Sequence, residues 1–333
     1  MASGYRVLTK SRFRSSTVWI GWNATAAHLS QQLPPSPRTH GQTLSPMETP
    51  GGMSCHTWAR WLKEITVSFL NVPGAQLYYD VSGEGLPLVF VHGAGANSTV
   101  FFQQVAHFNK QYRVICLDMR GFGRSYADPE SFHPRQFSED LARILDVEVD
   151  GPVVAVCQSM GAWAGLPLAV REPDRFHALV LSGSPTPAYG PHHKVLEVVS
   201  ERFRRVAAGE KVPPQDLGFS EHFVREHPEL IALYQMLARM NQKLDLSTIT
   251  DPELRLMPEH FIDYQIPTLV MGGLQNKLLG PNTHMVAASC IPGAQAYTFT
   301  ESGHSSYFEE PEHYNRVVEE FLHANGHAPS NKE

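Results

Sequence analysis

The sequence predicts an α/β fold: a three-layer sandwich with a mostly parallel sheet of eight strands and a helical insertion. From residue 65 onward, short β-rich segments alternate with segments of helical periodicity. The later β-rich segments are continuous apolar runs, as expected of parallel strands covered on both faces. Residues 184 and 267 are separated by about 80 residues, far more than the crossover of about a dozen that joins two parallel strands.

Eight segments have the composition of strands, and each ends in or near turn residues such as glycine, aspartate or serine. They lie near residues 65–72, 75–81, 87–93, 113–119, 152–158, 178–184, 267–273 and 294–300. The first two alternate between polar and apolar residues, which favours an antiparallel edge of the sheet. The later strands are therefore expected to form its parallel part.

Helices are expected between these strands, over residues 98–108, 136–146, 160–171, 282–290 and 313–324. The long insertion also has helical periodicity, because two sets of apolar residues recur at intervals of three and four. These sets are Leu196, Val199, Phe203 and Val206, and then Leu230, Leu233, Leu237 and Met240. An insertion at the carboxyl end of a parallel sheet lies where such sheets bind ligands, so it is interpreted as a cap over a pocket. Most of these side chains are expected to pack the cap onto the core.

The first 47 residues differ from the rest, with five basic residues and no aspartate or glutamate. This composition indicates an organelle transit peptide or a disordered leader, and an over-extended reading frame with Met53 as the true start explains it too. No apolar core of a secretory signal is present, so we expect a cytoplasmic or organellar protein. The expected division is a leader over 1–64, a core over 65–184 and 265–325, a helical cap over 185–264, and a tail over 326–333.

Composition excludes several classes of protein. The net charge of -6 argues against a nucleic-acid-binding surface, and no apolar run reaches the length of a membrane span. The chain is 42% hydrophobic and 18% charged, which allows a sizeable core. Its four cysteines are far apart, as suits reduced thiols better than a disulfide framework or a zinc site.

The run VVAVCQSMGAW, residues 153–163, ends an apolar strand at Ser159 and continues into a helical segment. A serine in such a turn exposes its hydroxyl, and the first N–H groups of the helix face an oxyanion formed there. The usual pattern is G-x-S-x-G, with small residues because strand and helix pass close together. Gly161 fits this pattern, and Cys157 replaces the first glycine. Ser159 is therefore the candidate nucleophile, with the Met160 N–H as an oxyanion donor.

A second apolar strand, in PLVFVHGAGAN at 87–97, ends in His-Gly and small residues. A glycine-rich turn there lets a backbone N–H approach a substrate oxygen, so Ala94 is the candidate second oxyanion donor. No Gly-Lys-Ser/Thr follows, which argues against a phosphate-binding loop. We interpret His92 as a structural residue that holds this loop.

A serine hydroxyl needs a base to remove its proton at neutral pH. His304 follows the last expected strand, in the segment TESGHSSYFEEPEHYN, just before the final helix. A histidine in that loop returns to the serine turn, and the required order along the chain is serine, acid, histidine. Ser159 and His304 satisfy the two ends of this order. No pair of the other histidines has convincing metal-ligand spacing, so no metal site is predicted.

With these segments in order, the chain resembles the α/β-hydrolase superfamily over residues 65–325. The matching motifs are HGAGAN, DMRGFGRS, CQSMGAW, PTLVMGG and SGHSSYFEEPEHYN. DMRGFGRS resembles the D-x-R-G-x-G-x-S turn of the family, which is structural. The serine-containing turn resembles that of esterases, enol-lactone hydrolases and carbon–carbon bond hydrolases. Epoxide hydrolases and haloalkane dehalogenases carry aspartate at that corner.

The acid of the family usually follows the strand at 267–273, in a G-x-x-D pattern. Here the segment reads MGGLQNKLLGP, and counting from Gly273 places Asn276 at the acid position. Counting from Gly272 places Gln275 there instead. Neither side chain is a carboxylate, and the alternative position, in SGSPTPAYG after the strand at 178–184, has none either. Three acids lie nearby in the sequence without a predicted position relative to His304: Asp251, Asp263 and Glu301.

Two functional hypotheses follow. In the first, a serine hydrolase cleaves a small carboxylic ester or lactone: Ser159 attacks, His304 transfers the proton, and Ala94 and Met160 bind the oxyanion. Asn276, or a carboxylate elsewhere, orients His304, and an amide there is expected to attenuate turnover. In the second, the missing acid marks a non-catalytic ligand-binding protein. Carbon–carbon bond hydrolysis is less favoured.

Hydrolysis needs only water, so no cofactor is expected. Several aromatic and methionine residues of the cap suggest an apolar substrate group, although each also suits a core. They are Phe219, Phe223, Met236 and Met240. The sequence indicates no oligomeric state.

Overall fold

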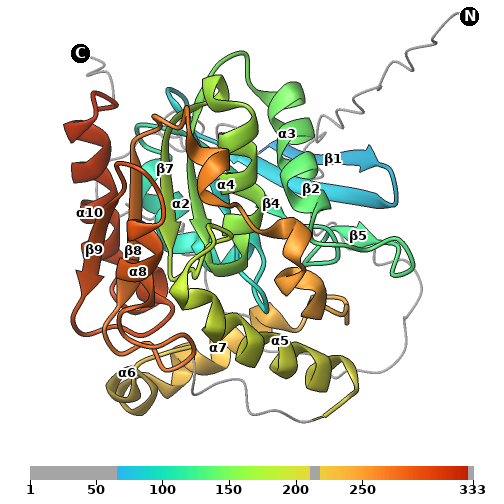
Figure 1. Cartoon of the computed structure of the whole chain (residues 1–333). Coiled ribbons are helices and arrows are strands. Elements are labelled where there is room, and N and C mark those ends of the chain that lie inside the picture. The colour runs from blue at the N-terminus through green and yellow to red at the C-terminus, as the bar shows by residue number, and fades with distance from the viewer. Residues whose placement is uncertain (1–65, 211–217, 329–333) are drawn as a thin grey trace, which may run out of the picture. The chain divides into compact units, whose positions relative to one another are not determined.

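The computed structural model describes residues 66–210 and 218–328 (Figure 1). The predicted leader, with its transit-peptide interpretation and Cys55, lies outside the described residues, and so does the end of the predicted tail. Cys116, Cys157 and Cys290 are free thiols. No helix in the described ranges is long and apolar enough to span a lipid bilayer.

Eight strands form the main path of one mixed sheet, in the order β1-β2-β4-β3-β6-β7-β8-β9. They are β1 Thr66–Val72, β2 Ala75–Ser82, β3 Pro87–Val91, β4 Arg113–Asp118, β6 Val153–Gln158, β7 Phe176–Ser182, β8 Thr268–Gly273 and β9 Gln295–Phe299. β1 and β2 are antiparallel to their neighbours, whereas all pairs from β4 to β9 are parallel. The predicted sheet and its antiparallel edge are therefore confirmed. The two-residue strand β5, Tyr126–Ala127, pairs with β2 and was not predicted.

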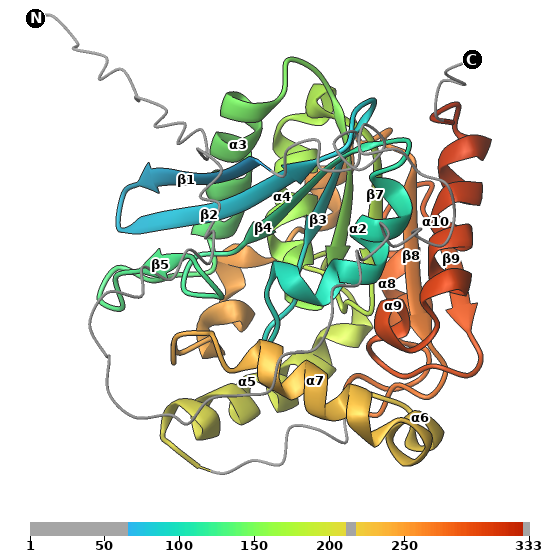
Figure 2. The same cartoon turned by 180° about the vertical axis from the view of Figure 1, so that it is seen from behind.

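Helices cover both faces of the sheet. Successive residues of its inner strands point to opposite faces, and both sets of side chains are buried. Val89 and Val91 of β3 join the cluster formed with α3 Gln136–Glu148, α4 Ala162–Arg171 and α8 Thr283–Ser289. Leu88 and Phe90 join the cluster formed with α2 Phe102–Phe108 and α10 Pro311–Ala324. Figure 1 shows α3 and α4 over one face, and Figure 2 shows α2 and α10 over the other. This is the predicted three-layer arrangement.

Residues 185–264, which we call the cap segment, contain α5 Lys194–Ala207, α6 Glu221–Glu226 and α7 Pro228–Ala238. These helices lie together beyond one end of the sheet in both views. The remaining short helices of the described residues are η1 Ser98–Phe101, η2 Ser159–Gly161, η3 Pro173–Arg175, η4 Pro191–His193, η5 Ser247–Thr250, η6 Pro252–Leu254, η7 Pro258–Phe261 and α9 Ser306–Glu309. On α5, Leu196 and Val199 are buried, as predicted.

The predicted apolar face of α7 is wrong in part. Leu233 and Met240 are exposed, and the helix ends at Ala238, before Met240. The side chains that pack onto the core are Leu230, Ile231, Tyr234 and Leu237. Because ELIALYQML is apolar almost all round, two overlapping stripes fit the helical period and periodicity alone does not choose between them.

Phe219 and Phe223 are buried in an aromatic cluster of the core. Phe219 packs edge-on against Tyr234 at a centroid distance of 5.0 Å, and both phenylalanines lie within 6.3 Å of Phe308. Met236 and Met240 are exposed. The two aromatic residues therefore attach the cap segment to α9, and their burial is accounted for by packing.

Candidate active site

Ser159 lies at the sharp turn between β6 and the helix that follows. Its φ of +50° is in the left-handed region, which costs a non-glycine residue about 1–3 kcal/mol and occurs mainly at functional turns. Gln158 and Met160 on either side are buried, whereas Ser159 is partly accessible. A Cβ atom at Gly161 would lie 2.5 Å from the carbonyl oxygen of Val91, so the helix approaches β3 as closely as the predicted pattern requires.

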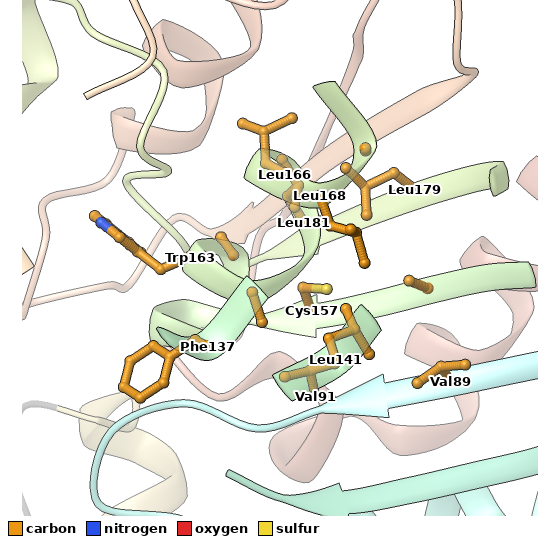
Figure 3. Packing of buried hydrophobic residues seen from close by; sticks show 14 of the residues in the cluster. Val89, Val91, Phe137, Leu141, Cys157, Trp163, Leu166, Leu168, Leu179 and Leu181 are labelled. Carbon is orange, nitrogen blue, oxygen red and sulfur yellow. The ribbon is translucent and has the colours of Figure 1, made fainter. Parts of the chain in front are cut away.

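Cys157, the residue that departs from the expected glycine, is accommodated by a glycine on the opposing helix. A Cβ atom at Gly165 of α4 would overlap with the sulfur of Cys157. Figure 3 shows the Cys157 side chain in the apolar cluster with Val91, Leu141 and Leu181. The sequence signal for this compensation was the glycine inside a helical segment, where glycine needs a packing reason.

The Cys157 thiol does not compete with Ser159 as a nucleophile. It is fully buried, and burial raises its pKa to about 12. The thiol is therefore protonated at neutral pH, and a protonated buried thiol is inert.

The loop after β3 forms a turn against the serine. The Ala96 N–H donates to the Gly93 carbonyl at 3.3 Å, and Gly95 in the third position has a φ of +76°, as a type II turn requires. A Cβ atom at Gly93 would lie 2.7 Å from the Cβ of Ser159, so loop and serine are in contact. Ala94, between the two glycines, is half-buried.

Met160 supplies the second candidate oxyanion donor. It is in the first turn of η2, where backbone N–H groups have no partner within the helix. Met160 directly follows Ser159, and Ala94 directly follows Gly93, the loop residue that contacts Ser159.

His92 is structural, as predicted. Its Nδ1 lies 2.8 Å from the Gly93 carbonyl, and its Nε2 accepts from the Met119 N–H at 2.9 Å, so the ring holds the start of the turn. Burial lowers the pKa of His92, which keeps the ring neutral.

The DMRGFGRS segment is also structural. Asp118 accepts from the Ser98 N–H at 2.7 Å and from the Arg124 N–H at 2.8 Å, and these bonds tie the β4 turn to η1. Arg120 makes a buried bidentate ion pair with Asp140, with both N–O distances 2.6 Å.

His304 lies beside Ser159, with 3.0 Å between His304 Nε2 and Ser159 Oγ. The loop that carries it packs against the end of β7, since a Cβ atom at Gly183 would lie 2.6 Å from the His304 carbonyl oxygen. Burial lowers the pKa of His304 to about 4, so the ring is neutral at physiological pH.

Asn276 lies on the other side of the ring, with its Nδ2 3.3 Å from His304 Nδ1. Its Oδ1 accepts two backbone N–H groups, from Leu278 and Leu279, both at 3.1 Å. Gln275 is exposed, and its amide is directed at the Thr300 carbonyl. Of the two positions that the sequence left open, the structure brings Asn276 to the histidine and leaves Gln275 outside.

The direction of the Asn276 amide determines the tautomer of His304. Rotating the amide by half a turn would place its NH₂ group against the N–H groups of Leu278 and Leu279, so Nδ2 faces the ring. Because Nδ2 can only donate, His304 Nδ1 must accept and the ring proton lies on Nε2, facing Ser159. A general base needs the opposite arrangement, with a free lone pair toward the serine.

No carboxylate is hydrogen-bonded to His304 in the described ranges. Asp263 and Glu301 are exposed, and Asp251 pairs with His133 at 3.3 Å. The contacts of the His304 ring therefore do not support any of these three acids as the group that orients it in place of residue 276.

One group in the described part of the chain has the spacing of metal ligands: His133, Asp251 and Glu253, with ligand atoms within 4.8 Å of one another. Its charges already have partners. The Arg135 N–H donates to His133 Nδ1 at 3.2 Å, which directs the ring proton toward the carboxylates, and the Arg135 guanidinium lies 3.6 Å from Glu253. The arrangement is that of an ion-pair cluster.

The segment from residue 88 to residue 318 matches the sequence profile of the Alpha/beta hydrolase family. This match spans more than half of the chain. The chain belongs to the alpha/beta hydrolase family. By its motifs and fold it is a serine hydrolase of that family.

This alpha/beta hydrolase is similar to 2-hydroxy-6-oxo-6-(2'-aminophenyl)hexa-2,4-dienoic acid hydrolase of Metapseudomonas resinovorans. The two are 26% identical over 269 residues, which cover 76% of this chain and 90% of the relative. A solved esterase from Thermogutta terrifontis has a TM-score of 0.64 and 24% identity, covering 78% of this chain and 97% of its own. The enol-lactonase from Burkholderia xenovorans LB400 has a TM-score of 0.63 and 22% identity, covering 77% and 99%. The two solved structures confirm the fold of this hydrolase.

Proposed function

We propose that this protein is a slow serine hydrolase of small carboxylic esters or lactones, which forms an acyl-enzyme on Ser159. The observation that carries the proposal is the position of His304, 3.0 Å from Ser159 Oγ and 3.3 Å from Asn276 Nδ2. The relatives include esterases, lactonases and carbon–carbon bond hydrolases, and a hydroxyl nucleophile with an oxyanion hole suits acyl transfer.

In the proposed reaction, His304 first exchanges its ring proton through solvent water, losing it from Nε2 and gaining one on Nδ1, so that Nε2 can accept the Ser159 proton. Ser159 Oγ then attacks the carbonyl carbon, and the Ala94 and Met160 N–H groups donate to the oxyanion. The proton on Nε2 passes to the leaving alkoxide. Water, deprotonated by the same nitrogen, hydrolyses the acyl-enzyme and restores the serine.

The first of these steps accounts for the slow rate. With the proton on Nδ1, an N–H would face the Asn276 NH₂, two donors with no acceptor between them. In a serine protease the Asp-to-Asn change lowers turnover by about 10⁴, and the oxyanion hole still supplies residual catalysis. We therefore expect measurable but weak turnover.

A fluorophosphonate probe and a panel of chromogenic esters and lactones test the proposal. We expect the probe to label the wild type at Ser159, and Ser159→Ala to abolish both labelling and turnover. The panel includes a vinylogous diketone, because preferential cleavage of its carbon–carbon bond would contradict the ester and lactone assignment.

The tautomer of His304 specifically favours one second candidate, a ligand-binding protein on the same fold. Two results together would support binding alone. The probe would fail to label the folded wild type, and an ester ligand would stabilise the wild type and Ser159→Ala to the same extent. Turnover that disappears in Ser159→Ala would exclude it.

A further inference from the structure

Asn241, a residue of the cap segment just after α7, is hydrogen-bonded to the loop that carries Ala94. Its Nδ2 donates to the Ala96 carbonyl at 3.1 Å. Its Oδ1 accepts from the Gly123 N–H at 2.9 Å and faces the Asn97 amide at 3.4 Å. One side chain thus joins the cap segment, the β3 loop and the β4 turn.

Ala96 is the residue through which Asn241 reaches the oxyanion turn. The Ala96 N–H closes this turn on the Gly93 carbonyl, and its own carbonyl accepts from Asn241. His92 holds the start of the same turn through Gly93. The turn is therefore fixed at one end from the core and at the other from the cap segment, with Ala94 between the two anchors.

We infer that Asn241 is a positioning residue for the oxyanion hole, which orients the Ala94 N–H by holding Ala96. The inference rests on the proposed function, since it gives the cap segment a part in binding the oxyanion. Donors in such a hole act only when aimed at the oxygen, and a displacement of about 1 Å lowers turnover by up to about 100-fold.

Gln242, the next residue, provides a matched control. Its side chain accepts from the Ala127 N–H at 2.8 Å and donates to the Ala127 carbonyl at 3.1 Å. It therefore anchors the same part of the cap segment with two hydrogen bonds, but to β5 and not to the oxyanion turn. If Asn241 only anchored the cap segment, substitutions of Asn241 and of Gln242 would lower activity to the same extent.

The kinetic test compares Asn241→Leu with Gln242→Leu on an ester that the wild type cleaves. We expect Asn241→Leu to lower kcat by about 10- to 100-fold with little change in KM, and to weaken binding of a trifluoromethyl ketone, which forms an oxyanion on the serine, by a similar factor. Gln242→Leu is expected to change neither by more than a few fold. Equal losses in the two variants at similar unfolding temperatures would overturn the inference.

A second readout does not depend on turnover. Backbone hydrogen exchange of the 93–97 segment should accelerate in Asn241→Leu and remain at the wild-type rate in Gln242→Leu. Asn241→Asp serves if the leucine variant does not fold, because it keeps the acceptor for Gly123 and replaces only the donor facing Ala96. Unchanged exchange in the Asn241 variants overturns the inference even if the enzyme is active. Faster exchange in a protein without turnover supports the positioning and refutes only the proposed function.

Discussion

At the scale of single residues, the nature of one atom at position 276 decides which nitrogen of His304 carries the proton. The Leu278 and Leu279 N–H groups would bind a carboxylate oxygen as well as they bind the Asn276 amide oxygen. The second carboxylate oxygen would then accept from His304 Nδ1–H and leave Nε2 free toward Ser159. The turn around residue 276 is thus already built for an acid.

Asn276→Asp is therefore expected to raise kcat/KM for ester hydrolysis by up to about 10⁴-fold, the factor by which the reverse change lowers turnover in a serine protease. Steady-state kinetics on the best ester of the panel measures it. Gln275→Asp is the control, because it adds the same charge one residue away on an exposed side chain. A gain in the control as large as in the variant would mean that general electrostatics, not the tautomer, limits turnover.

The acidic limb of the pH–rate profile should also respond. In the wild type His304 has a pKa lowered to about 4 by burial, so its base form persists down to that pH and activity falls below it. A carboxylate beside the ring favours the imidazolium and raises this pKa. Asn276→Asp should therefore move the limb of kcat/KM to higher pH, and an unshifted limb would contradict a direct contact between the two side chains.

The sequence predicted Ser159 and His304 from the ends of their strands. Asn276 came from the G-x-x-D pattern of the family that the chain resembles, which left Gln275 open as well. It could not predict the direction of the Asn276 amide. That direction depends on two N–H groups of the turn that follows, and no pattern of side chains encodes where they point.

At the scale of elements, the close contact between β6 and α4 depends on complementary side-chain volumes. Cys157 on β6 fills the space that Gly165 on α4 leaves free. We expect Gly165→Ala to destabilise the protein by about 1–3 kcal/mol, because the added methyl group overlaps with the cysteine sulfur. In a Cys157→Gly background the same change should be neutral, or stabilising by up to about 1 kcal/mol through helix propensity. Denaturant unfolding of the wild type and the three variants measures the coupling, and additive effects would show that the two residues do not share this space.

The strands were predicted closely because each buried strand is a short apolar run bounded by turn residues. β5 was missed because a two-residue strand has no period. The face of α7 was predicted only in part for the opposite reason. Nearly every residue of that helix is apolar, and the side that packs depends on its neighbours in the fold, such as Phe219 and Phe308 against Tyr234.

At the scale of the whole molecule, the cap segment is fastened to both sides of the site. On one side Asn241 binds the loops after β3 and β4, and Gln242 binds Ala127 of β5. On the other, Glu309 of α9 accepts from the Gly303 N–H and from the Ser220 N–H, both at 2.9 Å. Glu309 thus joins the histidine loop to the start of α6.

Glu309→Gln should break one of these two bonds, because an amide nitrogen cannot accept. We expect a loss of about 1–3 kcal/mol in the free energy of unfolding and a lower kcat through a looser His304 loop. Glu310→Gln is the control. The Glu310 carboxylate pairs with His313 at 3.0 Å, whereas the Gly303 and Ser220 N–H groups donate to Glu309. Thermal unfolding and ester kinetics check both variants, and equal effects would argue against a special role of Glu309.

The overall architecture was predictable because alternating strands and helices leave few ways to cover both faces of a sheet. The attachment of the cap segment was not, because it rests on single polar contacts between residues far apart in the chain, such as Asn241 with Ala96 and Glu309 with Ser220. Neither contact follows a spacing that a sequence displays.

The amide at position 276 has a consequence for the chemical ageing of the protein. Asparagine is thermolabile, and hydrolysis of its side-chain amide by water releases ammonia and gives aspartate, which here would place a carboxylate in a turn that already fits one. If the carboxylate restores about 10⁴ in turnover, about one aged chain in 10⁴ would contribute as much activity as all the others together. A stored preparation should therefore gain activity with time, and peptide mass spectrometry across residue 276 must accompany any rate assigned to the intact enzyme.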